Sequence, residues 1–127
     1  MIDEFGICYY DIVADRLKYI CSTQLSSNKL YTFSTPRVLD DVSVMDACSM
    51  KIINKNPAVA YISDNDDGTA SVKYVRATDI VGSGPWDSPV TILTTPSDTT
   101  LNAVIYMCVV DDKPAIVLNN EKGRAII

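Results

Sequence analysis

One pattern of short apolar runs occurs more than once in this chain, and a repeat constrains a fold more than any single motif does. The best-preserved copy consists of three segments, at 57–63, 71–77 and 86–92. An earlier copy lines up with them, segment for segment, at 5–11, 17–22 and 33–39. The two copies are spaced by roughly 53 residues, which is the period of a supersecondary unit rather than of a short motif.

Shared details inside the segments support this alignment. An aromatic residue stands three places before a proline in both copies, as Phe33 before Pro36 and as Trp86 before Pro89. A partial third copy aligns 113–118 with 56–61. The sequence therefore predicts one repeat domain over 1–127 with about two and a half units. These units span approximately 5–44, 45–98 and, as a partial copy, 99–127.

Each unit is predicted to form four antiparallel strands, because its apolar runs are short, rich in Val, Ile and Tyr, and separated by turn-forming residues. In the middle unit we expect these strands at 48–54, 57–63, 70–77 and 89–94. The second strand is apolar on both faces, which suits an inner strand packed between two neighbouring sheets. No stretch shows a helical period over ten residues, so low helix content is expected.

Two connections in the middle unit are predicted from their turn residues. The segment Asp64–Thr69 indicates a hairpin turn in which Gly68 adopts a backbone conformation that other residues resist. The segment 79–85, with Gly82 and Gly84, is predicted to be a loop. These glycines precede a strand rather than a helix, so the segment is not a phosphate-binding loop.

Four-stranded antiparallel units at this period are typical of β-propeller blades. The predicted fold class is therefore all-β, with propeller-type blades that are incomplete at both ends. The first unit lacks its innermost strand, and the third stops near the start of its third strand. Trp86 and Phe33 are expected to wedge between blades.

The segments at 56–63, 71–79 and 84–92, with the sequences N-P-A-V-A-Y-I-S, S-V-K-Y-V-R-A-T-D and G-P-W-D-S-P-V-T-I, resemble the repeat of propeller-like proteins of bacteria and large DNA viruses. The resemblance covers nearly the whole chain, strongly over 45–95 and weakly beyond 119. It implies a blade fold. It supplies no established catalytic residues to transfer to this chain.

The charge balance argues against a nucleic-acid partner. Eleven basic residues stand against sixteen acidic ones, for a net charge of −5, and no cluster of Lys or Arg appears. The first residues carry acidic groups where a secretory signal carries basic ones, and no apolar run approaches the length of a membrane span. We therefore expect a soluble, unexported chain in the cytoplasm or in a virion, with no membrane partner.

The residue types present restrict the available chemistry. The chain contains no histidine, which excludes Ser-His-Asp, Cys-His and His-metal sites. Its cysteines lie far apart in sequence within apolar runs, which favours reduced, buried thiols over a disulfide framework or a zinc site. They are Cys8, Cys21, Cys48 and Cys108.

Acidic residues offer two weaker alternatives. The run Asp64–Gly68 has oxygen ligands suited to calcium, but it lacks the distal Glu of an EF-hand and fits a solvated turn better. It also departs from the Asp box of sialidase-type propellers. Carboxylates for glycoside hydrolysis could come from seven Asp residues, although Asp is also favoured at turns. They are Asp11, Asp15, Asp40, Asp41, Asp46, Asp79 and Asp87.

Some tyrosines and lysines recur at equivalent repeat positions. Shared core packing is the expected role of Tyr9, Tyr19, Tyr61 and Tyr74, and sugar stacking is the alternative. Lys18 and Lys73 are expected on a solvent face, or with a buried stem and a surface ammonium.

The sequence thus predicts no catalytic, cofactor-binding or metal-binding residue. We expect a non-enzymatic scaffold that assembles with itself, or docks onto a larger protein through open blade edges, for example within a virus particle. Two alternatives remain: a carbohydrate-binding, lectin-like propeller module, and a degenerate sialidase-like glycosidase fragment.

Overall fold

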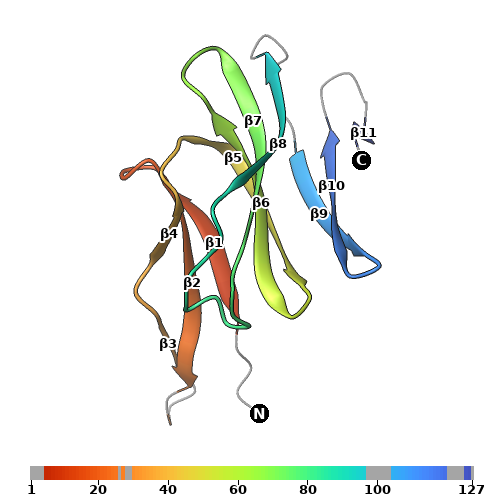
Figure 1. The fold of residues 1–127 in the computed structure, drawn as a ribbon. Helices are drawn as coiled ribbons and strands as arrows, with labels where there is room; N and C mark the ends of the chain where they lie inside the picture. The colour runs from red at the N-terminus through yellow and green to blue at the C-terminus, as the bar shows by residue number, and fades with distance from the viewer. Residues whose placement is uncertain (1–4, 26, 28–29, 97–103, 120–124, 127) are drawn as a thin grey trace.

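The computed structural model describes residues 5–25, 27, 30–96, 104–119 and 125–126, and every regular element among them is a β-strand. The strands form three antiparallel sheets that follow one another along the chain (Figure 1). The all-β prediction is confirmed.

The middle sheet is a meander of four consecutive strands. They are β5 (Val44–Ile53), β6 (Asn56–Asp64), β7 (Thr69–Arg76) and β8 (Val90–Pro96), paired in that order. The predicted strands agree with these closely, except that β5 begins four residues earlier than the expected start at 48.

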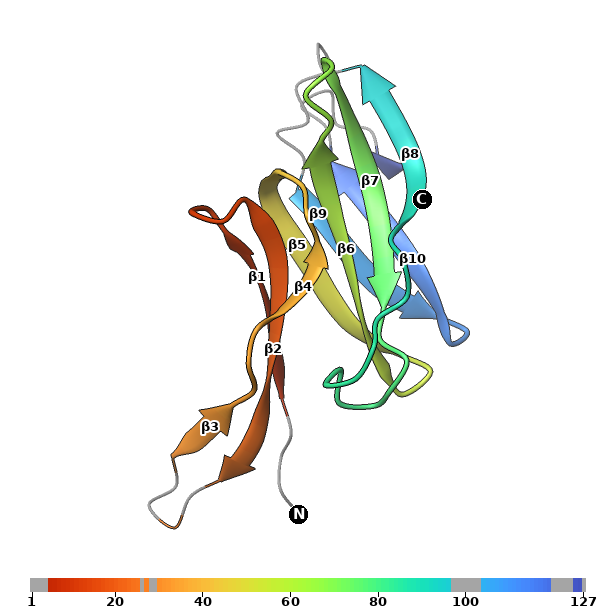
Figure 2. The same ribbon diagram turned by 60° about the vertical axis from the view of Figure 1, so that its left-hand side comes forward.

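The first sheet is built on β2 (Arg16–Leu25), which pairs with β1 (Gly6–Asp11) along one edge. Its other edge carries two short strands in succession, β3 (Tyr31–Phe33) and β4 (Arg37–Asp40). Figure 2 shows β3 beside the C-terminal part of β2 and β4 beside the N-terminal part. The repeat alignment predicts one outer strand after Phe33, and β4 takes that place, while β3 is an additional short strand. Ser34–Pro36 separates the two strands, since proline cannot donate a ladder hydrogen bond.

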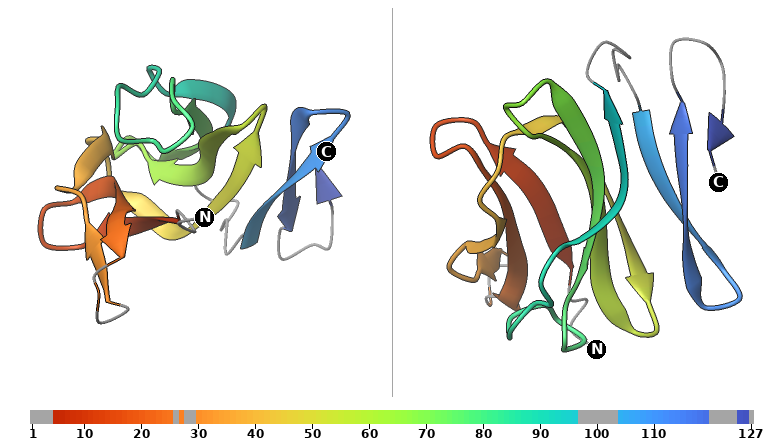
Figure 3. Two further views of the ribbon diagram at one scale, coloured as in Figure 1. Left: turned by 90° about the horizontal axis from the view of Figure 1, so that it is seen from below. Right: turned by 45° about the horizontal axis from the view of Figure 1, so that its top comes forward.

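The third sheet contains β9 (Val104–Val110), β10 (Lys113–Asn119) and the short β11 (Ala125–Ile126), in the order β11-β10-β9. β9 lies against β5 of the middle sheet (Figure 3). The backbone amide of Met107 donates to the Ser49 hydroxyl at 2.9 Å, which fixes the position of β9 along β5.

The middle sheet lies between the other two, and β6 is buried on both faces. Residues 57–63 are all buried. Val59 and Tyr61 pack toward the first sheet, whereas Ala58, Ala60 and Ile62 pack toward the third. The sequence is apolar on both faces of this strand, which predicted an inner strand packed between two sheets, and β6 is packed in that way.

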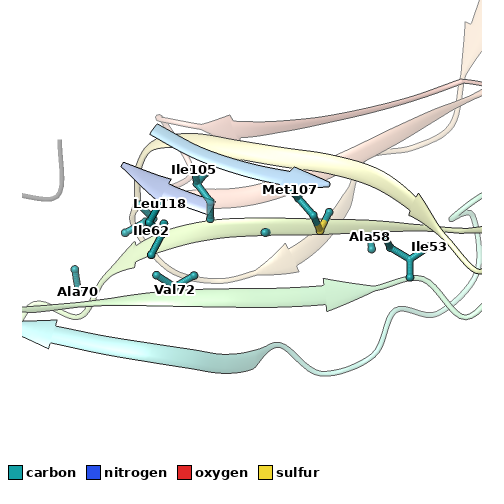
Figure 4. Close-up of a cluster of buried hydrophobic side chains, with 9 residues drawn as sticks. Ile53, Ala58, Ile62, Ala70, Val72, Ile105, Met107 and Leu118 are labelled. Atoms are coloured by element: carbon teal, nitrogen blue, oxygen red, sulfur yellow. The ribbon is translucent and has the colours of Figure 1, made fainter. Parts of the chain in front are cut away.

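Two apolar cores result, one on each face of the middle sheet. The core against the third sheet is drawn in Figure 4 and consists of Ile53, Ala58, Ala60, Ile62, Ala70, Val72, Ile105, Met107 and Leu118. The core against the first sheet consists of Leu17, Tyr19, Cys21, Leu39, Val44, Val59, Tyr61 and Val75.

The two predicted connections form as expected. In the β6–β7 turn, the amide of Asn65 donates to the Thr69 carbonyl at 3.0 Å, and Gly68 has a φ of 81°. Residues 79–85 form a loop outside the named strands, and Gly82 has a φ of 75°.

The two predicted aromatic wedges behave differently. Trp86 is half-buried, and its ring packs on Tyr19 of the first sheet with centroids 4.9 Å apart, so it does bridge two sheets. The prediction for Phe33 is wrong, because its side chain is 43% exposed and its ring contacts Phe5 of the same sheet.

Candidate functional site

A polar cluster joins the first and middle sheets. Asp40, at the end of β4, accepts hydrogen bonds through Oδ2 from the Tyr61 hydroxyl at 2.5 Å and from Lys73 Nζ at 3.1 Å. The Lys73 and Asp40 side chains are only 17% and 16% exposed. Burial, and after it the Asp40 carboxylate, raises the pKa of the Tyr61 phenol. Lys73 and Asp40 neutralise each other's charge within the cluster, and the contacts of Asp40 fix the first sheet against the middle sheet.

Lys18, which the sequence alignment matches with Lys73, has a similar arrangement within one sheet. Lys18 Nζ lies 2.6 Å from Asp11 Oδ2, and the ammonium lowers the pKa of that carboxyl. Asp11 also accepts hydrogen bonds from the amides of Val13 and Ala14 in the β1–β2 turn. Both lysines are half-buried and ion-paired. Lys18 lies on the outer face of the first sheet, whereas Lys73 shares the face of Tyr61 and Val75 toward the first sheet, so the expectation of a solvent face is wrong for Lys73.

Asp79 organises the loop over the first sheet. Its carboxylate accepts hydrogen bonds from the amides of Val81, Gly82 and Gly84 at 2.9, 2.6 and 2.5 Å. Burial raises the pKa of Asp79, but these amide hydrogen bonds outweigh it and hold the pKa below its ordinary value. The Tyr19 hydroxyl donates to the Val81 carbonyl at 2.7 Å, so the loop is fixed to the neighbouring sheet.

The acidic β6–β7 turn satisfies its own polar groups. Asp64 accepts a hydrogen bond from the Asp66 amide, and Asp67 accepts from both the amide and the hydroxyl of Thr69. The Thr69 hydroxyl lowers the pKa of the Asp67 carboxyl. Within the described residues, no group of three or more Cys, Asp or Glu side chains is arranged to hold a metal ion. This geometry favours the turn interpretation.

The remaining carboxylates proposed for glycoside chemistry serve in local contacts. Asp41 forms an exposed ion pair with Arg16 at 2.7 Å, and Asp15 accepts a hydrogen bond from the Tyr10 hydroxyl. Asp87 is exposed after Trp86. Asp46 lies within β5, and its side chain is outside the described part of the chain. Turn and ion-pair chemistry accounts for the described contacts.

The tyrosines divide between core and half-buried positions. Tyr19 and Tyr61 are 2% and 0% exposed, so the predicted core role is confirmed for both. Tyr9 and Tyr74 are half-buried.

The cysteines do not all lie apart, as their spacing in sequence suggested. Cys8 Sγ and Cys48 Sγ are 2.9 Å apart across the boundary between the first and middle sheets. Cys21 is buried nearby, and Cys108 belongs to the third sheet. No local spacing pattern could reveal this pair, because it depends on how two sheets stack.

Clefts open on the surface formed by the described residues. An apolar groove of about 340 Å³ lies where β10 incompletely covers the β7–β8 side of the middle sheet, with Val72, Tyr74, Leu93 and Ile116 among its lining residues. A more polar cleft of about 550 Å³ lies beside Arg37, whose Nε donates to the Ser83 carbonyl at 2.8 Å.

The outer face of the first sheet is partly apolar. Residues paired directly across an antiparallel ladder share a face, so Ile7 with Ile20, and Tyr9 with Lys18, point away from the middle sheet. Ile7 is 42% exposed. No described part of the chain covers this face with a further sheet.

The outer face of the third sheet has the same character. Tyr106 pairs with Val117, and Cys108 pairs with Ala115, on the face opposite the core residues of β9 and β10. Val104 and Tyr106 are 66% and 54% exposed. Both ends of the stack therefore present apolar sheet faces to solvent.

These features define an all-β protein of three stacked antiparallel sheets, with polar clusters that join sheets and with open apolar faces at both ends of the stack. Comparison with protein-family models, with curated protein sequences and with solved structures gave no match for this chain. The described residues include no helix of the length and apolar character needed to cross a bilayer.

Proposed function

We propose that this chain is a non-enzymatic assembly module whose sheets are propeller-type blades, and that it associates with further copies of itself through the outer faces of its first and third sheets. The observation that carries the proposal is the recurrence of the same strand positions at each contact between sheets. A role within a larger particle, such as a virion, is compatible with this mode of assembly.

The face that each sheet turns toward the preceding sheet supports this idea. In the middle sheet, the pairs Cys48–Tyr61 and Met50–Val59 face the first sheet. By the repeat alignment of Pro57 with Pro114, the pairs Ile105–Leu118 and Met107–Ile116 take the same places in the third sheet. Both of these pairs pack on the middle sheet.

The outer face of the first sheet presents the residues that would make such a contact with a preceding sheet. The alignment of Phe5 with Pro57 puts Ile7 in the place of Val59 and Tyr9 in the place of Tyr61. Val59 and Tyr61 are fully buried, whereas Ile7 is 42% exposed. A preceding sheet would bury it.

The outer face of the third sheet presents the complementary positions. In the repeat alignment, Ala115 and Val117 match Ala58 and Ala60. Ala58 and Ala60 belong to the middle sheet, and the third sheet packs on them. The first sheet of one copy can therefore pack on the third sheet of another as sheets pack within the chain. Such a contact is head-to-tail, and it forms a closed ring when the rotation between successive copies adds up to a full turn. Two copies would bring together about six sheets, within the four to eight blades typical of propellers.

Size-exclusion chromatography with light scattering tests the proposal, in a reducing buffer so that Cys108 forms no cross-link. At tens of micromolar we expect about twice the 13.9 kDa of the chain. Ile7→Glu and Val104→Glu, at opposite ends of the stack, should each give a folded monomer. Ile12→Glu is the matched control, because Ile12 is 81% exposed in the β1–β2 turn and outside both faces.

Mixing the two monomeric variants tests the head-to-tail geometry. A mixture contains one unaltered face of each kind, so it should recover association that neither variant shows alone. A monomeric unaltered chain would overturn the proposal, and failure of the mixture to associate would overturn the head-to-tail arrangement. Binding on a glycan array, or turnover of a fluorogenic glycoside lost in one Asp→Asn variant, would favour the carbohydrate-related alternatives instead.

A further inference from the structure

Two thiols from different sheets meet at one point in the structure. Cys8 lies on β1 with its side chain toward the middle sheet, and Cys48 lies on β5 with its side chain toward the first sheet. Their sulfur atoms are 2.9 Å apart, and both residues are free cysteines. No polypeptide segment has to move far for these two sulfurs to react with each other.

The surroundings favour reaction at this pair over the other two cysteines. Cys8 and Cys48 are half-buried, so a small reagent can reach them, whereas Cys21 is 1% exposed. Cys108 is also half-buried, but it lies on the third sheet, across the middle sheet from the other three cysteines, so it has no second thiol of the same chain to pair with. Cys21 and Cys108 therefore serve as internal controls.

The two thiols are chemically unequal. The hydrogen bond with Cys8 lowers the pKa of the Cys48 thiol, while the same bond, together with burial, raises the pKa of the Cys8 thiol. Since the thiolate is the nucleophile in exchange reactions, Cys48 is the sulfur that attacks first.

We propose that Cys8 and Cys48 form an oxidisable pair that closes into a disulfide between the first and middle sheets when the protein meets a small-molecule disulfide. The Cys48 thiolate attacks one sulfur of that disulfide, forms a mixed disulfide and releases one thiolate. Cys8 then loses its proton and attacks the Cys48 sulfur, which releases the second thiolate. Two protein thiols are oxidised, and one small-molecule disulfide is reduced to two thiols.

The cross-link would enclose β2, β3 and β4 in a covalent loop and tie the first sheet to the middle sheet. Restricting the unfolded chain in this way stabilises the folded state. The pair is independent of the proposed assembly, because both sulfurs lie at a contact between sheets within one chain rather than on an outer face.

The test uses the full chain equilibrated with oxidised or reduced glutathione, followed by thiol titration, peptide mass mapping and thermal unfolding. Oxidation should remove two of the four thiols, link the peptides that contain Cys8 and Cys48, and raise the Tm by about 10 °C. Cys21→Ser and Cys108→Ser should keep this response, while Cys8→Ser and Cys48→Ser should lose it.

Alkylation kinetics provide a readout that does not depend on the stability of a variant. In the unaltered reduced chain, iodoacetamide should modify Cys48 faster than Cys108, and prior oxidation should protect both Cys8 and Cys48. A mixed glutathione disulfide that persists at Cys48, four thiols that stay free, or a linkage through Cys108 would each overturn the proposal.

Discussion

The Tyr61 hydroxyl donates a hydrogen bond of 2.5 Å to Asp40, and thereby connects the most buried strand of the middle sheet to the end of a short strand in the first sheet. Lys73 binds the same carboxylate oxygen. Removing Asp40 leaves a buried hydroxyl and a half-buried ammonium without their acceptor. We expect Asp40→Ala to lower the free energy of unfolding by about 2–3 kcal/mol, as measured by urea denaturation.

The neighbouring residue provides a matched control for that prediction. Asp41 pairs with Arg16, but their side chains are 69% and 44% exposed. Exposed ion pairs contribute little, so Asp41→Ala should destabilise the chain much less than Asp40→Ala does in the same measurement. Equal losses for the two variants would show that Asp40 does not join the sheets as described.

Trp86 tests the contact between the β7–β8 loop and the first sheet. Its ring packs on Tyr19, and its Nε1 donates to the Gly82 carbonyl at 3.0 Å, but the side chain is only half-buried. Trp86→Ala should therefore cost about 2–3 kcal/mol, at or below the lower end of the range for a fully buried aromatic ring. Phe33 is more exposed, so Phe33→Ala should lower the free energy of unfolding by less than about 1 kcal/mol in chemical denaturation. A larger loss for Phe33→Ala than for Trp86→Ala would contradict the packing of Trp86 on Tyr19.

Gly82 is required by both backbone conformation and space. Its φ is 75°, and a Cβ atom there would lie 2.7 Å from Tyr19 Cε1. Gly82→Ala should lower the unfolding free energy by about 2 kcal/mol. Gly68→Asn is the control, because Gly68 also has a positive φ but is exposed in a turn, where Asn tolerates this conformation. Its cost should stay below about 1 kcal/mol in the same thermal or urea measurement.

Asp79 should contribute to the pH dependence of stability. Its pKa is lowered in the folded chain relative to the ordinary 3.8, so its contribution is fully present above that value. The contribution is lost as the pH falls through the lower folded pKa. The urea midpoint of Asp79→Asn, followed from pH 7 to about pH 2, should begin lower and decline less steeply than that of the unaltered chain. Parallel curves would count against the role of these amide hydrogen bonds.

The sequence predicted the local structure of the middle sheet well, for a physical reason. Strand β6 requires apolar side chains on both faces, and its flanking turns require Asn, Asp and Gly. Residues that are adjacent in sequence therefore determine both the strand and its turns. The expected strand at 57–63 accordingly matches the observed Asn56–Asp64.

Contacts between sheets were harder to predict. Asp40 was expected to serve turn chemistry, but it binds Tyr61 and Lys73 of the next sheet. The proximity of Cys8 and Cys48 was also missed. Such pairs depend on the rotation and offset of one sheet against another, which no local residue pattern encodes. The coincidence of Lys18 with Lys73 was the available signal, since a lysine repeated within an apolar strand requires a carboxylate partner.

The burial of β6 on both faces has a consequence for hydrogen exchange. An amide of β6 is bonded within the middle sheet and is also covered by layers on either side. Deuterium can reach it only when the strand ladder opens and both neighbouring sheets separate. Exchange at residues 58–63 should thus report the global free energy of unfolding, while amides in β1 and β9, at the outer edges of their sheets, exchange through smaller local openings.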